Sequence, residues 1–255
     1  MIAVFVAMES ELAGLARRLS AREYRAIGGR RVVRGRCGEA DVLACRTGIG
    51  ERVEGAMRAV LERYEAAFVL SAGVAGALDP DLRAGDLLLC ETVVSDPDPQ
   101  PPAVRSDARL LEAAASAAAR AGLRVRRGRS LTVDGIVGDP AAKADLRLST
   151  GADVVEMESN RVGLAAQERG LPFLAVRAVL DGAADPLPEL PCAVAPDGTE
   201  RMWPVLPYLV GHPLRLPLLL RLARCQRRAV ETLGLFLEAF TGALPPLPVA
   251  GAKPA

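Results

Sequence analysis

Four acidic residues stand close to the ends of short apolar runs in this sequence: Glu11, Asp134, Glu158 and Asp181. Each of them could stabilise the positive end of a following helix dipole. Four such residues in one class of position favour a second interpretation, a shared site in which carboxyl groups with different pKa values perform acid–base chemistry. Their spacing alone leaves the reaction open.

Two glycine-rich segments, 47–50 and 71–76, follow predicted strands and are interpreted as turns. Backbone N–H groups in such turns can approach an anion. Neither segment has the spacing of a Walker A or a G-x-G-x-x-G motif. Ordinary strand-to-helix turns are therefore the alternative.

Composition and charge exclude several classes of protein. The 255 residues include 32 basic and 31 acidic ones, for a net charge of +1, whereas nucleic-acid binders need a basic excess. Half of the residues are hydrophobic, which argues against a disordered chain. The five cysteines have no C-x-x-C spacing and His212 is the one histidine. We therefore expect no disulfide framework, no metal site and no Ser-His-Asp triad.

The elements that must position the acidic residues follow from the hydrophobic pattern. Strands are predicted over residues 2–7, 42–46, 67–71, 87–94, 131–133, 154–157 and 173–179. Helices are predicted over residues 10–19, 51–64, 110–122, 141–148 and 159–169. This alternation predicts an α/β fold with a largely parallel sheet. Ligand sites in such folds lie beyond the carboxyl ends of strands, where the four acidic residues fall.

The composition changes after Asp185. Twelve of the 19 prolines lie within residues 186–255. A loop is predicted over 187–203, an apolar and basic helix over 216–240, and a tail over 241–255. We therefore divide the chain into a core, 1–185, and a section, 186–255, that packs on the same domain. The sequence has no signal peptide pattern and no uncharged stretch of roughly 18 residues, so we expect a cytoplasmic protein.

Six short blocks within residues 1–185 carry a family resemblance. They are Ala-Met-Glu-Ser-Glu at 7–11, Thr-Gly-Ile-Gly at 47–50, Ser-Ala-Gly-Val-Ala-Gly-Ala-Leu at 71–78, Leu-Arg-Ala-Gly-Asp at 82–86, Val-Glu-Met-Glu-Ser at 155–159 and Val-Arg-Ala-Val-Leu-Asp at 176–181. In this order they resemble the nucleoside phosphorylase superfamily, in its methylthioadenosine/S-adenosylhomocysteine nucleosidase branch. The resemblance implies a three-layer fold, a mixed and mostly parallel twisted sheet flanked by helices, with a C-terminal helical extension.

The section after Asp185 resembles a narrower group, the hopanoid-associated phosphorylases. The similar features are Pro-Asp-Gly at 196–198, the proline-punctuated stretch 203–218 and the basic, apolar helix. This resemblance implies removal of adenine from adenosylhopane in hopanoid biosynthesis. The loop 95–102 also looks shorter than its counterpart in the nucleosidases, which would leave room for a bulky 5′ substituent.

The resemblance implies a role for each candidate residue. Asp181 matches the acid that protonates N7 of adenine, and Glu11 matches the residue that positions or deprotonates the attacking water. Met157 matches a residue packed against the ribose, and Glu158 one that accepts hydrogen bonds from its hydroxyls. The other predicted binding residues are Ile136, Val137, Val74, Ala75 and Gly76.

Two positions depart from the family pattern. Ile136 stands where relatives often have an aromatic residue that stacks on the base, and Val74 stands where they commonly have Ser near the nucleophile or phosphate. A valine side chain cannot form a hydrogen bond with the nucleophile or with phosphate. Water is therefore favoured as the nucleophile, with phosphate kept as a possible co-substrate and no other cofactor expected.

Two further functions stay open on the sequence. One is an ordinary methylthioadenosine/S-adenosylhomocysteine nucleosidase with an extended tail. The other is a non-catalytic module that binds nucleosides or a membrane surface, because the helix over 216–240 has a basic side beside an apolar one. A peripheral contact with the inner membrane through 203–240 remains an option, and the family resemblance implies a homo-oligomer.

Overall fold

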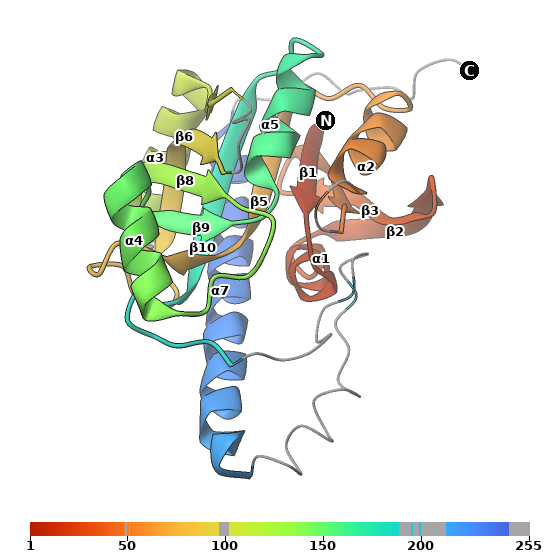
Figure 1. Cartoon of the computed structure of the whole chain (residues 1–255). Helices are drawn as coiled ribbons and strands as arrows, with labels where there is room; N and C mark the ends of the chain where they lie inside the picture. The colour runs from red at the N-terminus through yellow and green to blue at the C-terminus, as the bar shows by residue number, and fades with distance from the viewer. Residues whose placement is uncertain are drawn as a thin grey trace.

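The computed structural model describes residues 1–48, 50, 52–96, 102–188, 195, 199 and 213–244. In this part of the chain, ten strands form one sheet with helices on both of its faces (Figure 1). The strands are β1 (Ile2–Val6), β2 (Ser20–Ile27), β3 (Arg30–Cys37), β4 (Ala40–Arg46), β5 (Phe68–Ala77), β6 (Leu87–Ser95), β7 (Val104–Arg105), β8 (Val125–Thr132), β9 (Val154–Glu156) and β10 (Phe173–Asp181). The helices are α1 (Glu9–Ala16), α2 (Arg52–Leu61), α3 (Ala108–Arg120), α4 (Pro140–Thr150), α5 (Ser159–Gln167), the 3-10 turn η1 (Pro213–Arg215) and α7 (Leu216–Ala243).

The sheet is mixed and closes on itself at one end. Its order is β10-β6-β8-β9-β5-β1-β4-β3-β2, and β10 also pairs with β5, so β5, β10, β6, β8 and β9 form a ring. Parallel pairings join β4, β1, β5 and β10, and also β6, β8 and β9. The predicted mixed α/β fold is confirmed.

The parallel share of the sheet is smaller than predicted, because the antiparallel meander β2-β3-β4 was not expected from the sequence. In β2 every residue except Ile27 is exposed. Its sequence therefore lacks the alternation of apolar and polar residues that marks a half-buried strand.

Alternate residues of β1 enter two different cores. Ile2, Val4 and Val6 pack in a cluster with α1, α3 and the second half of α7. Ala3 and Phe5 point the other way, into a cluster with α2 and α5. Because successive side chains of a strand point to opposite faces, this strand is covered on both sides. The result is the three-layer arrangement that the sequence resemblance implied.

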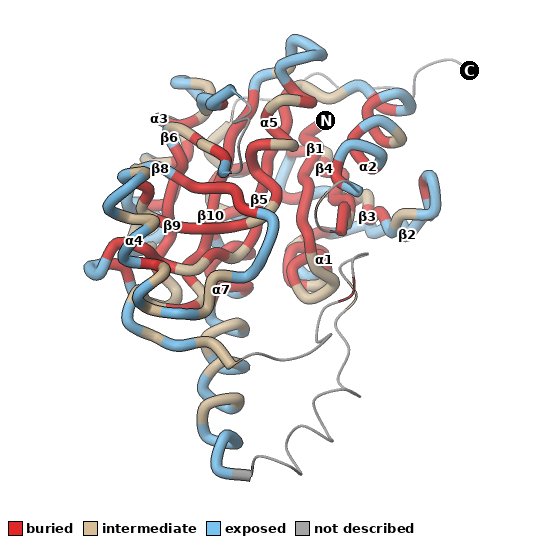
Figure 2. Tube along the Cα trace, viewed as in Figure 1, coloured by how far each residue is buried: buried red, intermediate tan, exposed pale blue. Residues whose placement is uncertain are grey.

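Helix α7 has two halves with different surroundings. From Ala229 onward it carries a buried face that includes Leu233, Phe236 and Phe240, part of the same core as β1. None of the side chains described over 214–228 is buried, and this half extends past the sheet (Figures 1 and 2). Among the described residues, no helix is long and apolar enough to cross a membrane.

Several predictions for the C-terminal section lie outside the described residues. Of the loop predicted over 187–203, only 187, 188, 195 and 199 are described, and of the short loop 95–102, only 95, 96 and 102. The predicted helix over 216–240 is confirmed and continues to Ala243, into the segment predicted as tail. His212 also lies outside the described part.

Candidate functional site

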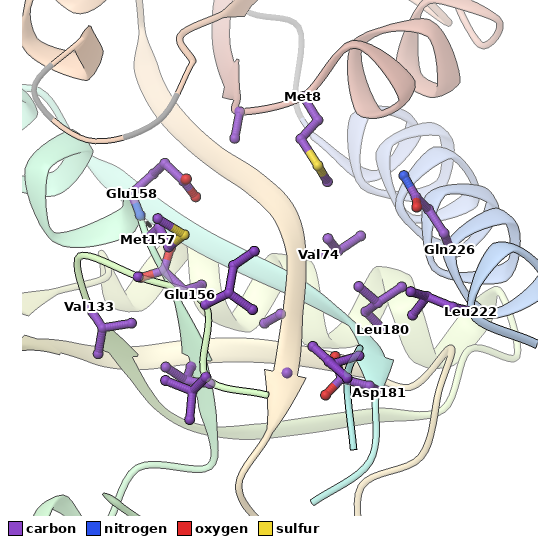
Figure 3. A pocket seen from close by; sticks show the side chains of 18 of the residues that line it. Met8, Val74, Val133, Glu156, Met157, Glu158, Leu180, Asp181, Leu222 and Gln226 are labelled. Atoms are coloured by element: carbon purple, nitrogen blue, oxygen red, sulfur yellow. Dashed lines mark hydrogen bonds between the residues drawn. The ribbon is translucent and has the colours of Figure 1, made fainter. Parts of the chain in front are cut away.

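A cavity of about 430 Å³ lies at the carboxyl ends of β1, β5, β9 and β10, with α7 contributing one wall (Figure 3). Its volume is within the range of small-molecule sites, about 300–1,000 Å³. All nine predicted site residues line it: Glu11, Val74, Ala75, Gly76, Ile136, Val137, Met157, Glu158 and Asp181. The other lining residues are Ala7, Met8, Val133, Gly135, Val155, Glu156, Leu180, Leu187, Pro188, Leu222 and Gln226.

The walls of the cavity differ in chemistry. Glu158 and Met157 follow β9 on one side, whereas Leu222 and Gln226 come from α7 on the opposite side (Figure 3). Asp181 ends β10 between them. A ligand that contacts every wall therefore has one end among carboxyl groups and another end against the apolar and amide side chains of α7.

Glu11 is held by three backbone N–H groups. Its Oε2 accepts from the N–H of Ala7 at 3.0 Å and of Met8 at 2.9 Å, and its Oε1 accepts from the N–H of Val74 at 2.8 Å. Burial raises the pKa of Glu11, and the backbone donors and Arg177 act against that rise. Three backbone donors stabilise the ionised form of this carboxyl, which is the form that can accept a proton from water.

The glycine-rich segment 71–76 lies within strand β5, so the predicted turn is wrong there. A Cβ added at Gly73 would lie 3.1 Å from Glu11 Oε1, and one at Gly76 would lie 3.3 Å from Asp181 Oδ2. These glycines are needed because carboxyl groups of the protein itself pack against the strand. In the other segment, Gly48 and Gly50 have positive φ angles, as expected of a turn.

Glu156, which the sequence analysis did not single out, forms the centre of a buried network. Its Oε2 accepts from Arg177 Nη2 at 2.6 Å and from the N–H of Ser159 at 2.8 Å, and Thr132 Oγ1 donates to its Oε1. Burial by itself would raise the pKa of Glu156, but Arg177 and the hydrogen bonds outweigh it and lower the pKa. Glu156 is therefore ionised and neutralises Arg177.

Glu158 has the opposite environment. Burial, followed by repulsion from the ionised Glu156, raises the pKa of Glu158 to about 8. Arg177 opposes this rise, but its guanidinium is bonded to Glu156. At neutral pH the cavity thus holds carboxyl groups in both protonation states, as acid–base chemistry requires.

Asp181 is paired with a lysine that the sequence analysis did not predict as functional. Lys143 Nζ, from α4, donates to Asp181 Oδ2, to the carbonyl of Gly182 at 3.0 Å and to the carbonyl of Asp185 at 3.1 Å. Burial raises the pKa of Asp181, and the Lys143 ammonium acts to lower it. One sequence feature could have indicated this residue, since Lys143 and Lys253 are the only lysines in an arginine-rich chain.

Asp134 does not belong to the site. Its side chain is 59% exposed and pairs with Arg161 at 2.7 Å, although its neighbours Val133 and Gly135 line the cavity. Among the described residues, no group of three or more His, Cys, Asp or Glu side chains could hold a metal ion.

The charges around the cavity favour a ligand that develops positive charge. Four buried carboxyl groups, those of Glu11, Glu156, Glu158 and Asp181, lie there with two buried cations, Arg177 and Lys143. Each cation forms an ion pair with a carboxyl group of the protein, Lys143 with Asp181 and Arg177 with Glu156. An anionic ligand would therefore meet cations that are already paired, whereas the Glu11 carboxylate, which backbone N–H groups hold, could stabilise a cationic transition state.

Comparison with known proteins identifies relatives of this chain. Residues 1–202 match the family model described as the phosphorylase superfamily. The 5′-methylthioadenosine/S-adenosylhomocysteine nucleosidase of Geobacillus kaustophilus is 34% identical over 200 residues, covering 72% of this chain and 85% of that protein. The nucleosidase of the same name from Tolumonas auensis is 30% identical over 203 residues, covering 73% of this chain and 88% of that protein.

Solved structures share the fold. The methylthioadenosine/S-adenosylhomocysteine nucleosidase of Neisseria meningitidis, in complex with methylthio-immucillin-A, superposes with a TM-score of 0.75 at 20% identity, covering 95% of this chain and 99% of that one. The futalosine hydrolase of Helicobacter pylori superposes with a TM-score of 0.73 at 18% identity, covering 95% of this chain and 97% of that one.

Proposed function

Because the chain belongs to the phosphorylase superfamily and its relatives are N-glycosyl hydrolases, we propose that it releases adenine from an adenine nucleoside with a bulky apolar 5′ substituent. The substrate that fits the sequence resemblance is adenosylhopane, an intermediate of hopanoid biosynthesis. The alternative substrates are 5′-methylthioadenosine and S-adenosylhomocysteine, the two compounds that appear in the names of the relatives.

The proposed substrate is supported above all by the apolar side of α7. Leu218, Leu222 and Gln226 are spaced four residues apart, so they share one face of the helix, and Leu222 and Gln226 line the cavity. One turn before Leu222, Leu218 continues this face and is half-buried. A lipid-like 5′ group could leave the cavity along this face without losing apolar contact.

The proposed reaction is a hydrolysis at C1′. Glu11 accepts a proton from water, the hydroxide adds to C1′, and the C1′–N9 bond breaks with its electron pair moving to the base. Asp181 donates its proton to N7, so neutral adenine leaves. Glu158 and Met157 hold the ribose, and the carboxyl groups stabilise the positive ribosyl transition state. Such a general acid is typically worth about 10²–10⁴ in rate.

Water is favoured over phosphate because Glu11 occupies the N–H group of Val74. A phosphate there would face the carboxylate and lose that donor. The test is to measure adenine release with and without added inorganic phosphate. A rate independent of phosphate supports hydrolysis, and a rate that requires phosphate would assign phosphorolysis instead.

The substrate is tested by comparing kcat/KM for adenosylhopane with that for 5′-methylthioadenosine. Higher kcat/KM on adenosylhopane supports the proposal, and turnover of 5′-methylthioadenosine alone would leave the alternative. Asp181→Asn should abolish adenine release, while Asp134→Asn, which changes an exposed acid outside the cavity, should retain it. Full activity of Asp181→Asn would contradict the mechanism and would favour a role in binding only.

We further propose that the first half of α7 contacts an anionic membrane surface, from which a lipid-linked nucleoside would be taken. This half carries Arg221, Arg224, Arg227 and Arg228, and no acidic residue occurs in α7 before Glu231. Its exposed apolar residues include Leu216 and Leu220. A basic and apolar helix surface suits the interface of an anionic bilayer.

Vesicle co-sedimentation tests this contact. The protein should pellet with phosphatidylglycerol-containing vesicles more than with neutral phosphatidylcholine vesicles, and Leu216→Ser/Leu220→Ser should reduce the pelleted fraction. Leu148→Ser, at an exposed leucine of α4, is the matched control. Equal pelleting of all three proteins would remove the proposed contact.

A further inference from the structure

Lys143 is a completely buried lysine that lies behind the cavity. Its exposed fraction is 0%, and its ammonium contacts Asp181, Gly182 and Asp185. These three hydrogen bonds use all the donors that an ammonium has. Burying a charged group is costly unless it is paired. The three hydrogen-bond partners of Lys143 therefore offset the cost of burying its ammonium.

The charge of Lys143 is unfavourably placed in helix α4. Lys143 is the fourth residue of α4, in the first turn after the N-cap Asp139. Positive charge at this end opposes the helix dipole. The favourable interactions of Lys143 therefore come from the end of β10 and the residues after it.

One hydrogen bond of Lys143 holds the Asp181 carboxyl by its Oδ2, and the other two hold the backbone carbonyls that follow β10. The charged groups around this carboxyl are Lys143 from α4 and Asp185 from the segment after β10, and Asp185 is itself paired with Arg221 of α7. Lys143 is thus the cation in direct contact with Asp181. After Asp181 gives its proton to a leaving base, the resulting carboxylate would be stabilised by this ammonium.

We propose that Lys143 is a positioning residue for Asp181, orienting its carboxyl toward the cavity and making it a stronger acid toward the leaving base. The proposal rests on the proposed role of Asp181 as general acid. Burial favours the protonated form of Asp181, and Lys143 favours its ionised form. These opposing effects keep the acid strength of Asp181 close to what proton transfer near neutral pH requires.

The test is the pH profile of adenine release by wild type and Lys143→Met, measured with whichever of adenosylhopane and 5′-methylthioadenosine the wild type turns over faster. Rate should fall as pH rises, because Asp181 must carry a proton. Without the ammonium, Asp181 keeps its proton to higher pH, so this falling limb should move upward by about one pH unit or more. At neutral pH kcat should drop about tenfold or more, with KM changed less than about threefold.

Arg147→Met is the matched control on the same helix. Arg147 pairs with Asp79 and Asp153, not with Asp181, so its loss should leave the falling limb in place. Where Lys143→Met does not fold, Lys143→Gln gives the same readout, because it keeps a donor without the charge. A falling limb that stays at the wild-type pH in a folded variant overturns the proposal.

The outcomes separate this inference from the proposed function. Full activity of Asp181→Asn contradicts the general-acid role and with it the role of Lys143. An inactive Asp181→Asn enzyme together with an unmoved limb in Lys143→Met contradicts the positioning role alone.

Discussion

Replacing Glu158 with glutamine should stabilise the protein at alkaline pH while impairing its site. The pKa of Glu158 is raised from 4.5 to about 8 by burial and by the neighbouring Glu156. Below about pH 4.5 both the folded and the unfolded protein hold this proton. As pH rises toward 8, the unfolded chain releases the proton and the folded protein keeps it. Stability is therefore lost over this range.

The size of the effect follows from the shift. Each pH unit between the two pKa values costs about 1.4 kcal/mol, so the free energy of unfolding should fall by about 4 kcal/mol between pH 5 and pH 8. Glutamine resembles the protonated acid and cannot ionise. Glu158→Gln should thus match wild type at pH 5 and exceed it at pH 8 by about 2–4 kcal/mol, the lower figure allowing for relaxation around the charge.

Urea unfolding at pH 5, 6, 7 and 8 measures this difference, with the free energy obtained by linear extrapolation. Asp134→Asn serves as the control, because that carboxyl is exposed and should follow wild type at each pH. If Glu158→Gln and wild type lose stability in parallel from pH 5 to pH 8, Glu158 is not held protonated in the folded protein. That result would contradict the assignment of an ionised Glu156 beside a protonated Glu158, on which the acid–base interpretation of the cavity rests.

Three other substitutions test the site. Glu11→Gln should abolish adenine release and destabilise the protein by about 1–3 kcal/mol, because an amide NH₂ would face a backbone donor; unchanged urea midpoint and activity would contradict the three-donor arrangement. Gly76→Ala should lower kcat, because its Cβ would lie 3.3 Å from Asp181 Oδ2, while Gly242→Ala in α7, outside the cavity, where a Cβ meets nothing within 4 Å, should retain activity. Ile136→Phe should lower KM about two- to tenfold by stacking on the base, and a raised KM would show that the base lies elsewhere.

The sequence predicted those features that depend on local periodicity. Helix α2 is an example, because Val53, Ala56, Met57, Val60 and Leu61 have helical spacing and all five are buried. A helix that packs on a core needs one apolar face, and the spacing of the apolar residues along the sequence shows that face directly. The placement of Glu11 and Asp181 beside one another was predicted in the same way, since carboxyl ends of adjacent parallel strands meet at one edge of a sheet. Glu158 also follows a strand, but β9 runs antiparallel to β5, so its place in the cavity depended on the pairing of the sheet.

Other features were decided by contacts between distant segments. Asp134 shares its predicted position with the three site residues, yet it pairs with Arg161 on the surface. Lys143 lies 38 residues before Asp181 and meets it only because α4 packs beside the end of β10. No local pattern distinguishes these two cases, because both depend on where a side chain lies after the sheet has closed.

The protonation states of the site also belong to the tertiary structure. From the sequence, Glu156 and Glu158 are two acids of one short motif. In the folded protein Arg177 contacts Glu156 and lowers its pKa, while burial beside that ionised group raises the pKa of Glu158. The sequence determined by itself which carboxyl groups are present and near which strand ends. Only the tertiary structure decided which carry a proton, because a pKa depends on burial and on charges brought near by folding.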